Sequence, residues 1–519
     1  MKMYNKFMIG VWLLLIMGLF AFGTGVVEAA GDPNGSDTYS DSIEGLKISI
    51  NVVWTLIAAF LVFSMQAGFA FLGGFLRQKN MLNYLAHCFI DSTLGACVFY
   101  FFGFAVMFGG SQTYSGLERG WPGIGWDGFM LLGDAYDVQT VMFWLFQMVF
   151  ATKTVTIIAG AVAERMKFVP YVIYSCLMCG IIYPLYGHWV WGGGWLSTLP
   201  IGAGVVDFAG CAVVHTVGGI MAFMGAWAVG PRKGKYNPDG SPNAIPGHNM
   251  TYVVIGCFIL AFGWFGFNAG STVAGTDLRI AIIATNTFLA AAAGATIMLF
   301  FTWKRQGFVD VSFVCNGALA GLVAITAPCA YVAPWAAVVI GVLAGLIMRG
   351  TVSLVEVKFK IDDPLGAVAV HGANGMWGML AVGLFADGTY GVNGLILGTG
   401  DQLLAQFIGT IVAFAYAFAF GGAVFFGLKG TIGLRSSALE EEEGLDIAYH
   451  GTSCYPVEEG YFGAVGEHLI DVQAEKEQLS LLEEAISKDR SREKIYSEKL
   501  GRWVYGKVKQ EKQLSKSKK

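Results

Sequence analysis

Charged residues are scarce in this chain. Asp, Glu, Lys and Arg together make up 13% of its 519 residues, whereas about a quarter of the residues of a soluble domain carry a charge. Hydrophobic residues make up 55% of the chain. This composition argues against an ordinary soluble protein. Since no basic patch lies within a soluble fold, it also gives no support to a nucleic-acid partner.

Motifs of metal and covalent chemistry are also missing. The nine cysteines follow neither the spacing of a zinc site nor that of a secreted disulfide framework. One close pair, Cys176 and Cys179, lies within an apolar segment without further ligands nearby, so we interpret the cysteines as small packing residues. The nucleophile motif GxSxG does not occur. We therefore expect no metal, no cofactor and no enzyme activity.

Long apolar segments are abundant instead. A helix of about 20 apolar residues crosses the hydrocarbon core of a bilayer, which is about 30 Å thick. The 71 glycines suit such helices, because small residues let them pack closely. The chain is therefore predicted to be an all-α polytopic membrane protein with eleven transmembrane helices. The predicted segments are 48–75, 81–108, 138–163, 169–190, 207–230, 250–270, 278–302, 308–328, 332–349, 365–386 and 402–428.

The two ends of the chain differ from this membrane domain, which we place at residues 31–430. Residues 1–30 combine two early lysines, an apolar core and small residues before Ala30, which is typical of a cleaved signal peptide. An uncleaved first helix is the alternative. Residues 431–519 form a charged tail with a predicted helix at 467–499. The tail is either a solvated helix with a frayed end or a surface for a partner or for anionic lipid.

The charges of the connecting loops predict the orientation. Lys and Arg follow every odd-numbered segment, whereas the loops after even-numbered segments are acidic or nearly neutral. Basic loops stay on the cytoplasmic side of a membrane. We therefore expect a multi-pass protein of the cytoplasmic membrane, with its N-terminus outside and its C-terminus in the cytoplasm.

A repeated pattern of aspartate and histidine stands out within the apolar segments. Asp207 is followed eight residues later by His215, and Asp363 is followed eight residues later by His371. The two copies lie in segments five and ten. An odd separation of five helices inverts the second half relative to the first, so the pattern predicts a five-plus-five inverted repeat plus one extra helix.

The two histidines are expensive to place in a membrane and are therefore candidates for function. The repeat predicts that they approach each other at the interface of the two halves. Burial in an apolar lining favours neutral imidazoles, and two neutral imidazoles in contact can pass a proton between them. A histidine that merely bonds a neighbouring carbonyl is the plain alternative. A metal site usually needs three or four ligands, and no further ligands accompany the pair.

The two aspartates begin their segments. Capping of the orphan N–H groups at a helix start is the plainer interpretation of Asp207 and Asp363, and direct contact with a cation is the alternative. Pro364 fits the first turn of a helix and favours capping.

Aromatic residues cluster near the outer helix ends. Trp191, Phe150, Trp264 and Phe267 fit either an interfacial belt or core packing, or a cage in which aromatic faces bind a small cation. Ser271 could add a hydroxyl acceptor to such a cage. Patterning alone does not choose between the two interpretations.

Several stretches together resemble the Amt/Mep/Rh family of ammonium transporters, in family order over about residues 45–455. The matching stretches lie within residues 66–70, 160–165, 207–215, 263–271, 362–372 and 443–451. The resemblance implies a homotrimer in which each subunit has its own pore. It also implies ammonium or ammonia as the substrate, and a PII-type signalling protein as a possible partner on the cytoplasmic face.

The resemblance also implies roles for the residues singled out above. His215 and His371 match the twin pore histidines, and Trp191 and Ser271, which favour the Amt branch, match the outer recruitment site. Phe150 and Phe267 match the pair that closes the pore, and Phe150 also borders the recruitment site. Trp264 matches a residue that lines the pore, and Asp207 matches a structural residue near the recruitment site.

The residues and the resemblance predict one mechanism. Ammonium is recruited at the outer site and deprotonated there, ammonia crosses the apolar section, and the proton travels along the two histidines. Electrogenic uptake follows from this. A passive ammonia channel and an ammonium sensor that acts through the tail remain as alternatives, and both would use the same residues.

Overall fold

The computed structural model describes residues 31–40 and 42–455, together with the backbone of residues 492–497 and 502–507. These residues belong to two compact units that divide after Gly451. The expected signal peptide at 1–30 lies outside the described residues.

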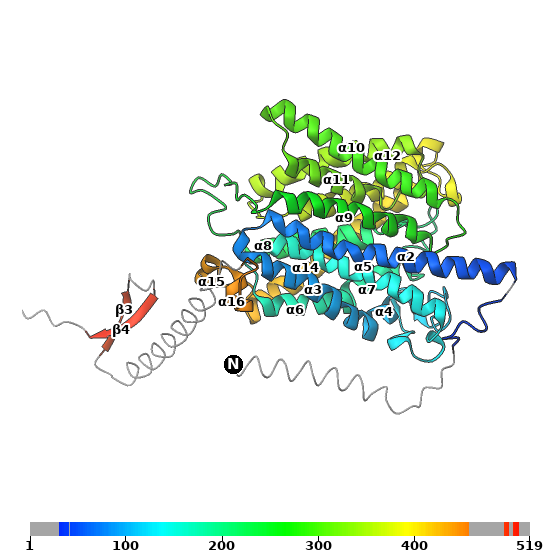
Figure 1. Cartoon of the computed structure of the whole chain (residues 1–519), viewed down its shortest axis with the longest axis horizontal. Helices are drawn as coiled ribbons and strands as arrows, with labels where there is room; N and C mark the ends of the chain where they lie inside the picture. The colour runs from blue at the N-terminus through cyan, green and yellow to red at the C-terminus, as the bar shows by residue number, and fades with distance from the viewer. Residues whose placement is uncertain (1–30, 41, 456–491, 498–501, 508–519) are drawn as a thin grey trace, which may run out of the picture. The chain divides into compact units, whose positions relative to one another are not determined.

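The first unit is a bundle of long helices that run side by side (Figure 1). Ten of the described helical segments are long and apolar enough to cross a membrane, and each coincides with a predicted segment. The predicted segment 308–328 forms a shorter apolar helix, α11 (Val311–Ile325). The protein is thus an all-α polytopic membrane protein. The ten segments are Ile43–Phe75, Gln78–Phe108, Val138–Val162, Phe168–Trp191, Cys211–Val229, Met250–Thr272, Ile280–Gln306, Pro334–Lys358, Val368–Phe385 and Asp401–Thr431.

Several of these segments contain more than one helical element. The α-helices that build them are α2 (Ile43–Phe71), α3 (Met81–Val98), α4 (Phe104–Phe108), α5 (Val138–Val162), α6 (Phe168–Leu177), α7 (Tyr183–Trp191), α8 (Val217–Val229), α9 (Met250–Asn268), α10 (Ile280–Gln306), α12 (Pro334–Ser353), α13 (Asn374–Phe385) and α14 (Asp401–Thr431). Five π-helical turns interrupt or extend them: η3 (Phe99–Gly103), η6 (Met178–Ile182), η7 (Cys211–Thr216), η9 (Leu354–Lys358) and η10 (Val368–Ala373).

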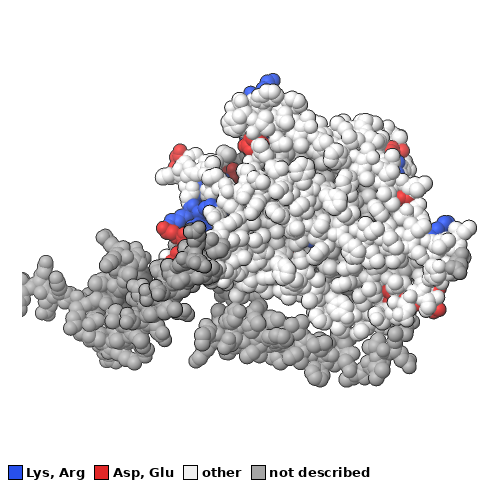
Figure 2. All heavy atoms as spheres, in the orientation of Figure 1, with Lys and Arg blue, Asp and Glu red and all other residues white. Residues whose placement is uncertain are grey.

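The sides of the bundle are apolar. On the face seen in Figure 2, charged atoms gather at the two ends of the helices, and the broad surface between them carries almost none. Large apolar side chains of the bundle, such as Phe60, Phe258 and Phe288, are more than half exposed. Exposed apolar surface of this extent is not stable in water, so the helices meet lipid or neighbouring chains along their length.

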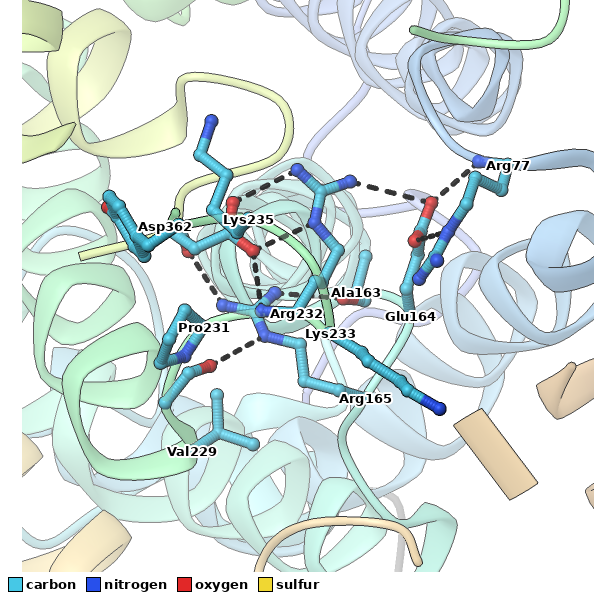
Figure 3. Close-up of polar contacts among 12 residues, drawn as sticks. Arg77, Ala163, Glu164, Arg165, Val229, Pro231, Arg232, Lys233, Lys235 and Asp362 are labelled. Carbon is cyan, nitrogen blue, oxygen red and sulfur yellow. Dashed lines mark hydrogen bonds and ion pairs between the residues drawn. The ribbon is translucent and has the colours of Figure 1, made fainter. Parts of the chain in front are cut away.

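A cluster of buried charges ties the connecting loops together at one end of the bundle (Figure 3). Arg232 forms a forked ion pair with Asp362, with N–O distances of 2.8 and 2.9 Å, and it also approaches Glu164 at 3.5 Å. Glu164 pairs in turn with Arg77, and Arg165 donates to the backbone oxygen of Asp362 at 2.6 Å. Burial would raise the pKa of Asp362, but the guanidinium groups of Arg165 and Arg232 outweigh it and hold this pKa well below its ordinary value.

Two short helices after the bundle lie at this same end, α15 (Ala438–Glu443) and α16 (Leu445–His450) (Figure 1). The buried Glu441 accepts a hydrogen bond from the backbone N–H of Lys233 at 2.6 Å. The carboxylate of Asp446 accepts from the backbone N–H groups of Leu82 and Asn83, which are orphan donors at the start of α3. The beginning of the tail is thereby bonded to the loops around the charge cluster.

In the second unit, the first part of the helix predicted at 467–499 lies outside the described residues, and its last part is wrong. Residues Arg492–Ser497 form strand β3, which pairs antiparallel with β4 (Arg502–Lys507). The apolar positions that predicted the helix end at Ile486. Isoleucine, tyrosine, tryptophan and valine, which favour strands, are concentrated in residues 492–507.

Candidate functional site

The two histidines occupy matching positions in the two halves of the bundle. His215 lies in the π-helical turn η7, directly before α8, and His371 lies in the π-helical turn η10, directly before α13. A π-turn places one extra residue in a helical turn and often marks a functional position. The same local distortion therefore presents both imidazoles.

The two aspartates cap these turns, as the plainer interpretation predicted. The Asp207 carboxylate accepts four backbone N–H bonds of 2.7–3.0 Å, from Gly210, Cys211, Ala212 and Val213. Asp363 accepts two such bonds, from Ala367 and Val368. Since the first N–H groups of a helix have no partner within it, both carboxylates fix the start of a histidine-bearing segment.

A close backbone contact joins the two segments. A Cβ placed on Gly219 would lie 2.1 Å from the backbone nitrogen of Gly372, so a glycine at position 219 is what lets the chains approach. Gly219 follows His215 by one helical turn, and Gly372 directly follows His371. The approach brings Nδ1 of His215 to 3.1 Å from Nδ1 of His371. The expected contact between the two histidines is present.

The contact restricts the protonation of the pair. A hydrogen bond between two Nδ1 atoms needs one donor and one acceptor, so the imidazoles cannot both be cationic. When both are neutral, the ring that donates through Nδ1 has an accepting Nε2, and its partner has an Nε2–H donor. The pair therefore has an acceptor at one end and a donor at the other, which is the arrangement needed to pass on a proton.

A file of aromatic rings leads to the pair from the far side of His215. Trp191 meets Phe150 edge to face, with ring centres 6.2 Å apart, and Phe150 lies against Phe267 with centres at 4.2 Å. Phe267 and Trp264 both stack on the ring of His215, at 5.6 and 5.4 Å. Phe150 and Phe267 are buried, whereas Trp191 is partly exposed. The file thus runs from a partly exposed ring to the buried histidines.

The outer end of the file carries the other two predicted features. The indole N–H of Trp191 donates to the backbone oxygen of Asp207 at 2.6 Å, which fixes the ring next to the capped turn. The Ser271 hydroxyl lies in η8 (Ala269–Thr272) and donates to the backbone oxygen of Phe267 at 2.7 Å. Because its proton is used in that bond, its oxygen is left as an acceptor, which is the polarity that a cation requires.

The inner side of His371 borders a small cavity of about 20 Å³. Apolar side chains form most of its wall, including Phe69, Leu72 and Leu365, and Thr156 adds a hydroxyl. None of these residues was singled out from the sequence. Phe69 shows why: an aromatic ring in an apolar helix gives no signal of what it faces. Among the described residues, no group of three or more His, Cys, Asp and Glu side chains is arranged to hold a metal ion.

Comparisons with known proteins agree on one family. The model of the Ammonium Transporter Family matches residues 53–455. The chain is 49% identical over 447 residues to ammonium transporter Amt2 of Archaeoglobus fulgidus, covering 83% of this chain and 93% of that protein. It is 38% identical to ammonium transporter 1 member 3 of Solanum lycopersicum, covering 81% and 96% of the two chains.

Solved structures show the same likeness. The structure named "Sensor Amt Protein" superposes with a TM-score of 0.72 at 38% identity, covering 78% of this chain and all of that one. The crystal structure of Candida albicans Mep2 superposes with a TM-score of 0.68 at 27% identity, covering 79% and 89%.

Proposed function

The chain belongs to the ammonium transporter family, and we propose that it moves ammonium by separating the proton from ammonia within each subunit. In this proposal the cation is recruited between Trp191, Phe150 and Ser271 and loses its proton there. Ammonia then passes the gate formed by Phe150 and Phe267 and crosses the apolar section. The proton moves separately along His215 and His371.

One observation carries the proposal, the hydrogen bond of 3.1 Å between the two buried imidazoles. A bare cation is expensive in an apolar pore, whereas ammonia is not. A connected pair of imidazoles gives the proton a route of its own through the section where the cation is costly. Among the described residues, no partner reaches the buried Nε2 of His215, so this atom is available to a proton donor in the pore.

The outer site supports the first step. The faces of Trp191 and Phe150 attract a cation, and the Ser271 oxygen accepts one of its hydrogen bonds. These contacts offset part of the cost of removing water from ammonium. Potassium is similar in charge and size but has no proton to release, so the later step discriminates against it.

The test is a current recorded after an ammonium jump on membranes that contain the protein. We expect an inward current for the parent chain and a current reduced by about tenfold or more in His215→Ala, because a relay group contributes about 10²–10⁴-fold. Discrimination against potassium should weaken in the same variant. Unchanged current and selectivity in a folded His215→Ala protein would overturn the relay.

A sensor role is the second candidate, favoured by the likeness to the structure named "Sensor Amt Protein". It would use the same outer site but signal through the tail, whose first part is bonded to the loops around Glu441. A sensor without transport would bind ammonium and carry neither current nor labelled substrate. A passive ammonia channel would carry substrate without current.

The assembly and its setting belong to the same proposal. We infer a homotrimer in the cytoplasmic membrane, with the N-terminus outside after removal of a signal peptide and the tail in the cytoplasm. A PII-type protein would then dock on the face that carries α15 and α16. Binding of such a protein to the full chain and to a chain without residues 431–519 tests the last step, and binding to neither would remove it.

A further inference from the structure

A second polar cluster lies beside the histidine pair, between α2, α3, α5 and α6. Its two charged members are Asp91 on α3 and Lys153 on α5, and both are buried, with 0% and 1% of their surface exposed. Charged side chains within membrane-spanning helices are costly and usually serve a function. The mechanism proposed above uses neither of them.

Hydroxyl groups surround the Asp91 carboxylate. Tyr171 donates to its Oδ2 at 2.7 Å. The Thr156 hydroxyl lies 3.0 Å from the same oxygen and the Ser175 hydroxyl lies 3.2 Å from Oδ1, and each shares its single proton with a backbone oxygen one helical turn earlier, at 3.0 Å. A hydroxyl can accept one proton while it releases another. The carboxylate is thus placed to receive protons through its own donors.

Lys153 supplies the compensating charge through an intermediate residue. Its ammonium group donates to the side-chain oxygen of Gln66 at 2.7 Å, and the amide nitrogen of Gln66 donates to the Thr156 hydroxyl at 2.9 Å. Among the described residues, no direct ion pair joins Lys153 to a carboxylate. The cation therefore polarises Thr156 and Asp91 without occupying the acceptor positions of the carboxylate.

Thr156 connects this cluster to the histidine pair. It lines the same cavity of about 20 Å³ as His371. A cavity of about 10–15 Å³ can hold one water molecule, so this cavity is large enough for one. The threonine oxygen has two acceptor positions, of which Gln66 uses one. The second is open to a water in the cavity, so one water can link the imidazole of His371 to Thr156.

A polar stripe continues from Asp91 to the end of the bundle where α16 lies. Asn83, His87 and Asp91 are spaced four residues apart on α3, so they share one face of the helix, and all three are buried. His87 stacks on Tyr171 with ring centres 3.5 Å apart, but neither of its ring nitrogens has a hydrogen-bond partner among the described residues, so the stripe is not a connected hydrogen-bonded path. Asn83 bonds the ring of His450 on α16 at 3.1 Å.

We propose that Asp91 is a proton acceptor for His371, so that it holds the proton beside the pore while ammonia continues through the apolar section. This inference rests on the proposed proton relay. The His371 imidazolium gives its proton to the cavity water, the water passes a proton to the Thr156 oxygen, and Thr156 releases its own hydroxyl proton to the Asp91 carboxylate. A neutral carboxylic acid results, and it returns the proton to the cavity water by the same steps in reverse.

Other ionisable groups also face Asp91 and belong to its electrostatic surroundings. They come from its own helix and from three elements packed against it: Tyr84 and Cys88 on α3, Lys153 on α5, Tyr171 and Tyr174 on α6, and Cys179 in η6. Among these six, Lys153 is the group that can balance the carboxylate charge.

The test compares current with ammonia flux in proteoliposomes that contain the full chain. Thr156→Val removes the connecting hydroxyl with little change of volume, and Asp91→Asn removes the acceptor. We expect both variants to lose current by about tenfold while the uptake of labelled substrate stays within about twofold of the parent. Asp91→Glu, which keeps a carboxylate, should retain part of the current.

Thr154→Val is the matched control, because Thr154 is a buried threonine of the same helix whose hydroxyl bonds the backbone oxygen of Phe150. It should keep the current. Full current in folded Thr156→Val and Asp91→Asn proteins would overturn the inference and leave the histidine relay intact. A parent chain that conducts ammonia without current would instead overturn the relay itself, and the inference with it.

Discussion

The approach of Gly219 to Gly372 allows a sharp prediction, because a single methyl group should open the histidine pair. In Gly219→Ala the new Cβ would lie 2.1 Å from the Gly372 nitrogen, and an ordinary contact of 3.4 Å requires a shift of about 1.3 Å. Passed on to the imidazoles, such a shift stretches their 3.1 Å bond beyond hydrogen-bond length. A misplacement of about 1 Å can cost about 100-fold in rate.

Gly219→Ala should also lower the free energy of unfolding, although alanine is a better helix former than glycine. Alanine in place of glycine improves helix propensity by about 0.8–1 kcal/mol, whereas overpacking of a tight core costs about 1–3 kcal/mol. Because the obstructing atom belongs to the backbone, we expect the higher cost and a net loss of about 2 kcal/mol.

Gly372→Ala is the matched control for this prediction. Its Cβ would meet backbone atoms of Gly219 at 3.3 and 3.5 Å, so a small adjustment accommodates it. Thermal unfolding in detergent and the ammonium-jump current measure the two effects. We expect Gly219→Ala to lower both melting temperature and current, and Gly372→Ala to keep most of each. Equal behaviour of the two variants would refute the argument from close approach.

Three further predictions concern the charges that hold the site. Asp207→Ala leaves four buried N–H groups without their acceptor and should destabilise the protein by about 3 kcal/mol or more, measured by thermal unfolding; a loss below about 1 kcal/mol would contradict the capping role. Arg232→Ala leaves Asp362 and Glu164 buried without their shared partner and should cost about 3–5 kcal/mol, whereas a neutral result would show that water replaces the guanidinium. The pKa of Asp362 is lower in the folded than in the unfolded protein, so its stabilising contribution is complete above about pH 4 and is lost as the pH falls further. The melting temperature of the parent should therefore exceed that of Asp362→Asn at neutral pH, and the difference should begin to narrow only as the pH falls below about 4; a difference that stays constant on further acidification would contradict the assignment.

The sequence was sufficient to predict the helices because membrane spans depend on local composition. Each predicted segment coincides with a helix, including the short α11. Helix starts were predicted less well: segments five and ten were expected to begin at positions 207 and 365, but the helical turns begin at Cys211 and Val368. Asp207 and Asp363 cap these turns, and the conformation of the residues just before each turn depends on which oxygen atoms accept their N–H groups.

For the candidate site, too, the features that depend on residue spacing could be predicted from the sequence, whereas those that depend on how the helices pack could not. The equal spacing of Asp207–His215 and Asp363–His371 predicted two matching segments, but the π-helical turns and the contact at Gly219 depend on how the two halves pack. Asp91 and Lys153 are visible in the sequence as charges in apolar helices. Their connection through Gln66 and Thr156 is not visible, because it joins side chains from three separate helices.

The central claim is that each subunit moves one proton for every ammonia molecule, and that the two travel along separate routes. The most direct measurement is the charge moved per ammonium taken up, from current and labelled substrate in the same proteoliposomes. Our account predicts about one charge per ammonium in the parent chain, and a ratio well below one in a folded His371→Ala protein that still conducts ammonia. Uptake by the parent without charge movement would contradict it.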